Sequence, residues 1–181
     1  MCKYTQVTRV HREWMKDFLS LRWGSSQIVA RGVLYQADRL PGFVGEDEHG
    51  DWIGLVTYHL GENQCEIVTL DSYWERTGIG SHLVDLVRVI AVKSDCKRLW
   101  LVTTNDNMNA LRFYQKRGFR LVAVYPNAVD AARQIKPIIP LVGNDGIPIR
   151  DEVELEQDLK NGLEKFGNVP EAANHWHAPK N

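Results

Sequence analysis

The amino-acid sequence predicts an α/β fold in which one sheet is joined by crossover helices. From residue 64 to residue 125 the pattern runs strand, helix, strand, helix, strand. Within it, 78–93 has apolar residues at helical spacing, and 98–104 is an apolar run typical of a strand covered on both faces. Strands joined through helices in this order usually share one sheet, so these observations favour an α/β domain.

The N-terminal part predicts a strand, a helix and a less regular segment. Residues 3–10 alternate polar and apolar side chains, which indicates a first strand, and residues 11–21 follow with helical spacing. The mixed pattern of 24–39 indicates a short helix and a loop. A strand is predicted to begin at 43–44 and a turn to follow at 48–51, and the run WIGLVTYHL after the turn completes a predicted hairpin. The run QCEIVTLDSY predicts the next strand.

The middle of the chain has the clearest helices. In 78–93, one face carries the apolar set Ile79, Leu83, Leu86, Val87 and Ile90, and Ser81, His82, Asp85, Arg88 and Lys93 fall toward the other. A second helix is predicted over 107–117. Gly118 stands where a left-handed helix stop belongs, and FRLVAVY then resumes a strand.

The C-terminal part is less regular. Residues 127–148 hold prolines and glycines among apolar residues, which indicates a long ordered loop or a short helix. Residues 151–159 alternate Val153 and Leu155 with acids, as expected of a closing strand at a sheet edge. We therefore expect one domain over 1–159 and a polar tail over 160–181. His175 and His177 in this tail offer a metal only two ligands, which is weak support for a metal site, and we expect none.

Composition excludes several classes of protein. The chain has 181 residues, 44% of them hydrophobic and 25% charged, with a net charge of -1, so it lacks the basic excess of a general nucleic-acid binder. No apolar run approaches the roughly 20 residues of a membrane-spanning helix. The charged N-terminal segment does not resemble a signal peptide, and three cysteines without paired spacing fit a reducing compartment. We expect a cytoplasmic protein without membrane or nucleic-acid partners.

A glycine-containing segment between a strand and a helix is the first functional signal. In Glu75-Arg76-Thr77-Gly78-Ile79-Gly80-Ser81, the glycines allow a sharp turn and a close approach of the backbone to a ligand. The helix that follows offers free N–H groups and the positive end of its dipole, which together bind phosphate or pyrophosphate. A nucleotide-triphosphatase loop is excluded because no lysine follows Gly80, and Leu83 stands where a dinucleotide fingerprint needs a third glycine. A plain strand-to-helix turn is the alternative.

This segment resembles the acetyl-CoA signature of the GNAT superfamily of N-acetyltransferases, [QR]-x-x-G-x-[GA]. Glu75, Gly78 and Gly80 occupy its three named positions, and Glu75 departs from the usual glutamine or arginine. A second stretch, from Asn107 through Ala110 and Tyr114 to Gly118 and Phe119, is similar to the family's N-x-x-A-x-x-[LF]-Y-x-x-x-G-F pattern. Two signatures in the correct order are far more specific than either alone.

The resemblance implies a GNAT fold: a mixed central sheet of about six or seven strands with a splayed central pair, flanked by helices. The splayed strands would be about 64–73 and 98–104, and the pantetheine arm of acetyl-CoA, the cosubstrate, would lie between them. Backbone groups of Val68, Thr69 and Leu70 would hold that arm, with the Leu70 N–H facing the thioester oxygen. The remaining cofactor-binding residues implied are Glu75, Arg76, Thr77, Gly78, Ile79, Gly80, Ser81, Asn107, Ala110 and Tyr114.

Tyr114 and Glu66 are the candidate catalytic residues. Periodicity alone places Tyr114 among the buried aromatic residues of its helix, whereas the resemblance implies the general acid that protonates the departing thiolate. Asn107 is expected to contact the CoA arm or to cap the helix. Glu66, four residues before Leu70, is the candidate base for the acceptor amine, with Gln64 or Asp71 assisting. The alternative for Glu66 is an exposed strand glutamate.

The acceptor is less defined than the donor. His59 and Tyr58 either line the acceptor pocket or form a packing pair, and the tryptophans at 14, 23, 52, 74 and 100 are expected mostly in the core. The acids at 46–51 and 151–158 either attract a cationic amine or serve solubility. We expect direct transfer to a small primary amine in a ternary complex. The alternatives are a protein or peptide N-acetyltransferase, transfer of a longer acyl group, or a catalytically silent CoA-binding module, and a homodimer is possible.

Overall fold

The computed structural model describes residues 2–74 and 76–160. Among these, seven strands form one mixed sheet in the order β1-β4-β5-β6-β7-β9-β8. Their bounds are β1 Lys3–Gln6, β4 Gly42–Glu46, β5 Trp52–Gly61, β6 Gln64–Ser72, β7 Arg98–Thr104, β8 Arg120–Tyr125 and β9 Glu152–Asp158. The predicted mixed sheet of six or seven strands is confirmed. The first strand is shorter than expected, and a 3-10 turn at Arg9–His11 follows it.

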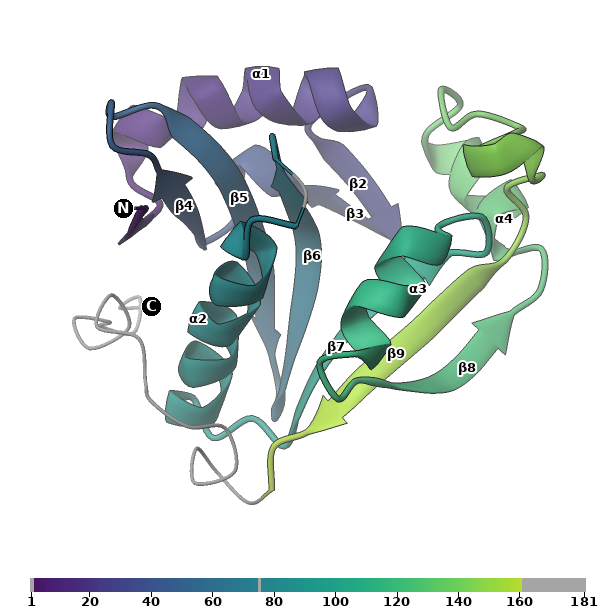
Figure 1. Cartoon of the computed structure of the whole chain (residues 1–181). Helices are drawn as coiled ribbons and strands as arrows, with labels where there is room; N and C mark the ends of the chain where they lie inside the picture. Colours follow the sequence, from purple (N-terminus) through teal and green to yellow (C-terminus); the bar gives the residue numbers. More distant parts are fainter. Residues whose placement is uncertain (1, 75, 161–181) are drawn as a thin grey trace.

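Helices cover both faces of the sheet (Figure 1). Helix α2, Ile79–Lys93, packs on β4, β5 and β6, and α3, Met108–Gln115, lies near β8. The buried apolar side chains of α2 join Tyr114, Leu99 and Leu155 in one core. Helix α1, Arg12–Trp23, contributes Met15, Phe18 and Leu19 to a second core with Val44 and Leu55. The apolar face predicted for 78–93 is therefore the face that is buried, whereas the helical spacing predicted for 11–21 extends to Leu21, which is 75% exposed.

The segment 24–39 differs from the prediction. It contains a two-stranded hairpin, β2 Gln27–Ala30 and β3 Val33–Gln36, followed by a 3-10 turn at Ala37–Arg39. The two residues between the strands, Arg31 and Gly32, have φ of +49° and +75°. Both positive values are what a tight two-residue hairpin turn requires, but arginine rarely occupies its first position.

The C-terminal strand is also placed differently from the prediction. β9 pairs with β7 on one side and β8 on the other, so it lies inside the sheet and β8 forms the edge. The acids that made β9 look exposed are paired: Glu154 accepts hydrogen bonds from Arg98 and Tyr125, and Glu156 from Arg98 and Arg120. Before it, residues 127–148 contain helix α4, Ala128–Ile135, and a 3-10 turn at Asn144–Gly146.

The central strands separate as the resemblance implied. β6 and β7 pair in parallel only where Gln64–Ile67 lie opposite Arg98–Leu101. Beyond Ile67 and Leu101, no pairing between them occurs among the described residues, and Figure 1 shows the strands diverging. β6 also carries a bulge, because Thr57 faces Thr69 whereas Tyr58 faces Ile67. A bulge adds a residue to one strand and redirects its peptide groups, here at Val68 next to the opening.

Candidate active site

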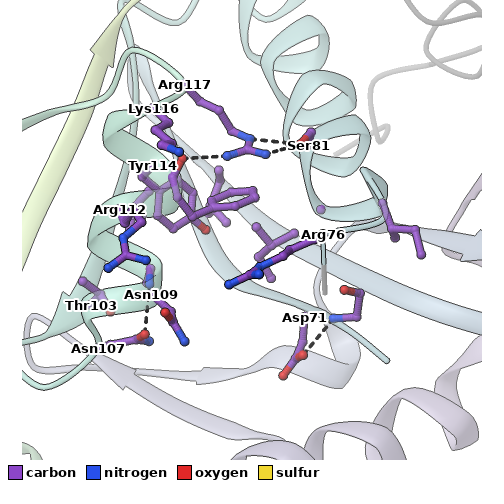
Figure 2. Close-up of a pocket in the computed structure, with 18 of the residues that line it drawn as sticks. Asp71, Arg76, Ser81, Thr103, Asn107, Asn109, Arg112, Tyr114, Lys116 and Arg117 are labelled. Atoms are coloured by element: carbon purple, nitrogen blue, oxygen red, sulfur yellow. Dashed lines mark hydrogen bonds between the residues drawn. The ribbon is translucent and has the colours of Figure 1, made fainter. Parts of the chain in front are cut away.

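A cavity of about 640 Å³ opens between the separated strands. β6 and β7 supply its inner walls, and the start of α2 and one face of α3 supply its outer walls (Figure 2). Val68 and Leu70 line it from β6, whereas the hydroxyl of the buried Thr69 lies 2.7 Å from that of Thr57 on the neighbouring strand. The predicted cofactor-binding residues that line it are Val68, Leu70, Arg76, Thr77, Gly78, Ile79, Gly80, Ser81, Asn107, Ala110 and Tyr114. Glu75 lies outside the described residues.

The turn into α2 has the geometry of a phosphate-binding helix start. Gly78 is the N-cap residue with φ of +87°, and Arg76 has φ of +62°. Gly80 lies in the first turn, where an added Cβ would stand 3.4 Å from the Phe113 ring and would take space from the cavity. The first N–H groups of a helix have no partner within it, so this end of the cavity favours an anion.

Basic side chains surround the same cavity. Arg76, Arg112, Lys116 and Arg117 line it, and Figure 2 shows Arg76 extending into the opening toward the side that carries Arg112. The Arg117 guanidinium lies over the Phe113 ring, 3.5 Å from its centroid, and donates to the Ser81 hydroxyl. It therefore ties the end of α3 to the start of α2. These charges and the helix start together suit a ligand with several phosphates.

Tyr114 lies deep in this cavity. Its side chain is buried, with its ring edge-on to Phe113 and Phe119 at 5.0 and 5.2 Å between centroids. Burial raises the pKa of Tyr114 well above its ordinary value, and the nearby charge of Arg117 opposes that rise. The phenol thus keeps its proton at neutral pH and is available as a donor. Asn107, at the start of α3, caps the helix by accepting the Ala110 N–H at 3.1 Å, and both residues line the cavity.

Glu66 lies on the opposite face of β6, beneath the β2–β3 hairpin. It is 3% exposed, so the alternative of an exposed strand glutamate is wrong. Burial raises its pKa from 4.5 to about 7, the hydrogen bond from Tyr35 opposes that rise, and Glu154 and Glu152 add to it. A carboxyl group with such a pKa can both accept and release a proton near neutral pH. Gln64 is engaged with Arg98, which donates to its side-chain oxygen at 3.0 and 2.8 Å.

An ion pair and exposed tryptophans form another part of the cavity wall. Arg22, near the end of α1, donates to both carboxylate oxygens of Asp71 at 2.9 and 2.6 Å. Trp23 and Trp74 are 39% and 50% exposed and line the cavity, so their expected place in the core is wrong. This wall joins the end of α1 to the end of β6, where β6 and β7 are no longer paired.

Of the two residues predicted to line the acceptor pocket, only His59 lies near Glu66. It is exposed, lines a small hollow together with Glu66, and its ring centre lies 5.5 Å from that of Tyr35. Tyr58 is buried and stacks on Phe43. Arg88, expected on the solvent face of α2, is buried and donates to Gln157 of β9 at 2.7 Å. The histidines at 175 and 177 lie outside the described residues. In the part of the chain that the structure describes, no helix is long and apolar enough to cross a membrane.

Comparison with known proteins identifies the family. Residues 8–119 match the acetyltransferase (GNAT) family. The chain is 43% identical over 144 residues to the uncharacterized protein YdhI of Bacillus subtilis, covering 80% of this chain and 90% of YdhI. It is 39% identical over 97 residues to N-alpha-acetyltransferase 30 of Xenopus laevis, covering 50% of this chain and 36% of that protein. The chain therefore belongs to the acetyltransferase (GNAT) family and is an N-acetyltransferase.

Solved structures share the fold. The IAA acetyltransferase from Bacillus cereus ATCC 14579 superimposes with a TM-score of 0.68 at 20% identity, over 88% of this chain and 100% of that one. A GNAT family acetyltransferase from Elizabethkingia anophelis, solved with acetyl-CoA bound, gives a TM-score of 0.63 at 18% identity, over 87% and 98%. At these identities the likeness establishes the fold alone.

Sequence reasoning missed several residues of the site. The sequence-based prediction does not include Arg117, although this residue lies within the second family signature, at one of its variable positions. Trp23 and Trp74 were assigned to the core because large aromatic residues are usually buried, and no local pattern marks them as exposed. Tyr35 was missed because the hairpin that carries it was not recognised.

Proposed function

We propose that this enzyme transfers an acetyl group from acetyl-CoA to a primary amine by direct attack in a ternary complex. The observation that carries the proposal is the cavity between the separated β6 and β7 strands, which is lined by Gly78 and Gly80 at the helix start and by Tyr114. The helix start and basic side chains suit the phosphates of CoA. The acetyl-CoA bound to the similar protein of Elizabethkingia anophelis supports this choice of donor.

The reaction follows from the groups on the two faces of β6. The amine, once its ammonium form has given a proton to Glu66, attacks the thioester carbon, and a C–N bond forms. The oxyanion that develops is stabilised by a backbone N–H at Leu70, which lines the cavity. The C–S bond then breaks, and Tyr114 gives its proton to the departing thiolate. The attacking nitrogen loses its second proton as the amide forms, which restores the Tyr114 phenol, and Glu66 releases the first proton to solvent. The reaction proceeds without an acyl-enzyme, because no cysteine is among the described residues that line the cavity, and burial raises the pKa of the Cys65 and Cys96 thiols.

A small amine is the acceptor that the geometry favours. Glu66 is 3% exposed beneath the hairpin, so the reacting amine has to be carried on a slender group. The buried acids Glu152 and Glu154 lie close enough to affect the Glu66 carboxyl and favour a cation on this face. These features support a small aliphatic amine such as a polyamine, an amino acid or an aminoglycoside.

The free N-terminus of a peptide is the second candidate acceptor. It is favoured by the 39% identity to N-alpha-acetyltransferase 30 over 97 residues. A main-chain amine is also slender, but the peptide behind it requires an extended groove at the cavity mouth, near Trp23 and Trp74.

Thiol release from acetyl-CoA across a panel of acceptors tests the proposal. The panel contains spermidine, kanamycin, glutamate and a set of tetrapeptides with free N-termini. Release with one of the small amines supports the proposed function, and release with the tetrapeptides alone replaces it with the second candidate. Tight binding of acetyl-CoA without release from any member would favour a silent CoA-binding module.

A further inference from the structure

The hairpin absent from the sequence-based prediction contacts the candidate base directly. Tyr35, on β3, donates its phenol proton to a carboxylate oxygen of Glu66 at 2.7 Å. Burial, together with this hydrogen bond, raises the pKa of Tyr35 well above its ordinary value, so the phenol keeps its proton and remains a donor at neutral pH. A donor that never ionises stabilises the charged form of its carboxylate partner.

The β2–β3 hairpin is held at both of its ends by contacts with other parts of the chain. The Arg31 guanidinium at its tip lies 3.2 Å from the centre of the Tyr125 ring and 3.5 Å from Glu152. At its base, the Lys136 ammonium donates to the carbonyl oxygens of Trp23 and Gln27 at 3.2 and 2.7 Å. These contacts hold both ends of the hairpin, so the Tyr35 phenol has little freedom to move away from Glu66.

A second, smaller hollow lies beside the pair. It measures about 210 Å³, and Tyr35, His59, Glu66 and Trp100 are among its walls. Glu66 lines this hollow, whereas its neighbours Ile67 and Val68 line the larger cavity. A hollow of this size holds several water molecules. A carboxylate beside such a space can rotate unless it is held, and the Tyr35 hydroxyl provides that hold.

The groups around Glu66 have opposing effects on its protonation. Burial and the acids Glu152 and Glu154 on β9 favour its protonated form, while Tyr35 on β3 and Arg98 on β7 favour the carboxylate. The other titratable groups on the walls of the smaller hollow are Arg31 and His59. Without the Tyr35 donor, the balance moves toward the protonated form, which cannot accept a proton from an ammonium group.

We propose that Tyr35 is a positioning residue for the transfer reaction, which holds the Glu66 carboxylate ionised and in one orientation to receive the proton of the acceptor amine. Tyr35 keeps its own proton throughout. The inference rests on the proposed role of Glu66 as the base. The β2–β3 hairpin then serves the reaction through Tyr35, in addition to covering Glu66.

The test compares Tyr35→Phe with Tyr125→Phe. Tyr125 makes the same kind of bond, to Glu154 at 2.7 Å, on the same face of the sheet, and so provides a matched control. The first readout is the titration of Glu66, followed by NMR on protein with 13C-labelled glutamate carboxyl groups and assigned by its loss in Glu66→Gln. It needs no acceptor. The second is the pH profile of kcat with the fastest amine among spermidine, kanamycin, glutamate and the tetrapeptides.

Hydrogen bonds to charged groups shift a titration by about one to two pH units. In Tyr35→Phe, the Glu66 titration and the acidic limb of kcat should both move upward by that amount, and the rate at pH 7 should fall roughly five- to fiftyfold. The rates of the wild type and of Tyr35→Phe should converge at high pH. Tyr125→Phe should keep the acidic limb of the wild-type pH profile. A merely structural role would lower the rate at every pH without moving the limb.

The possible failures are distinguishable. If Glu66→Gln keeps the wild-type rate and limb, the proposed base is wrong and the proposal for Tyr35 is overturned with it. If Glu66→Gln is inactive while Tyr35→Phe titrates as the wild type does, only the role of Tyr35 is overturned. Should Tyr35→Phe fold poorly, Tyr35→His, which retains a ring N–H donor, should restore the wild-type limb, and a limb that stays displaced would contradict the proposal.

Discussion

Replacing Glu66 by glutamine should make the protein more stable at alkaline pH, although it removes the candidate base. Burial raises the pKa of Glu66 from 4.5 to about 7, so ionising it inside the fold is unfavourable. A group whose folded pKa is raised in this way binds more protons in the folded state, and the free energy of unfolding falls as pH rises from about 4.5 to about 7. The amide oxygen of the introduced glutamine can still accept the Tyr35 hydroxyl.

The size of the expected change in stability follows from the pKa shift of Glu66. One pKa unit corresponds to about 1.4 kcal/mol, so the full shift corresponds to about 3 kcal/mol, most of which develops between pH 5 and pH 8. The advantage of Glu66→Gln over the wild type should therefore be about 2 to 3 kcal/mol larger at pH 8 than at pH 5. Urea unfolding followed by circular dichroism at both pH values measures it.

Glu156→Gln is the matched control on the same sheet face. Hydrogen bonds from Arg120 and Arg98 lower the pKa of Glu156, so its ionised form stabilises the fold above its ordinary pKa. That variant should be less stable than the wild type at both pH values, by nearly the same amount. The burial explanation is wrong if Glu66→Gln shows the same difference from the wild type at pH 5 and pH 8, or is the less stable protein at pH 8.

Three further substitutions test other residues of the site and its surroundings. Tyr114→Phe should lower kcat about 10²- to 10⁴-fold and leave acetyl-CoA binding nearly unchanged, and an unaltered rate would remove Tyr114 from the acid role. Gly78→Ala should lower the free energy of unfolding by about 1 kcal/mol, because the new Cβ meets nothing within 4 Å and only the positive φ is unfavourable. Lys136→Met should lower it by about 1 to 3 kcal/mol through loss of its bonds to Trp23 and Gln27, and equal stability in urea would show that these bonds contribute little.

The donor half of the site could be predicted because its chemistry depends on local sequence. Gly78 has a positive φ, and Gly80 leaves space beside the Phe113 ring in the cavity, so the site places two glycines at fixed spacing before an amphipathic helix. The position of Tyr114 follows in the same way from the helix that carries it. Such features appear in a window of a few residues, where helical spacing and glycine can be recognised directly.

The acceptor half could not be predicted because its residues meet across long sequence separations. Tyr35 and Glu66 are joined by a hydrogen bond, but nothing near Tyr35 marks it as a partner for a buried acid. The acids of β9 resembled a solvated edge because their partners, Arg98 and Tyr125, lie on other strands. An arginine at the first turn position concealed the hairpin itself.

Calorimetric titration of the protein with acetyl-CoA, with Gly80→Val as the comparison, tests whether the cavity between β6 and β7 is the donor site. We expect the wild type to bind one acetyl-CoA per chain. Binding should be weakened at least about tenfold in the variant, because a side chain at position 80 meets the Phe113 ring and takes space beside the helix start where the phosphates bind. If the wild type binds no acetyl-CoA, or if Gly80→Val binds it equally well, the assignment of this cavity as the acetyl-CoA site is contradicted.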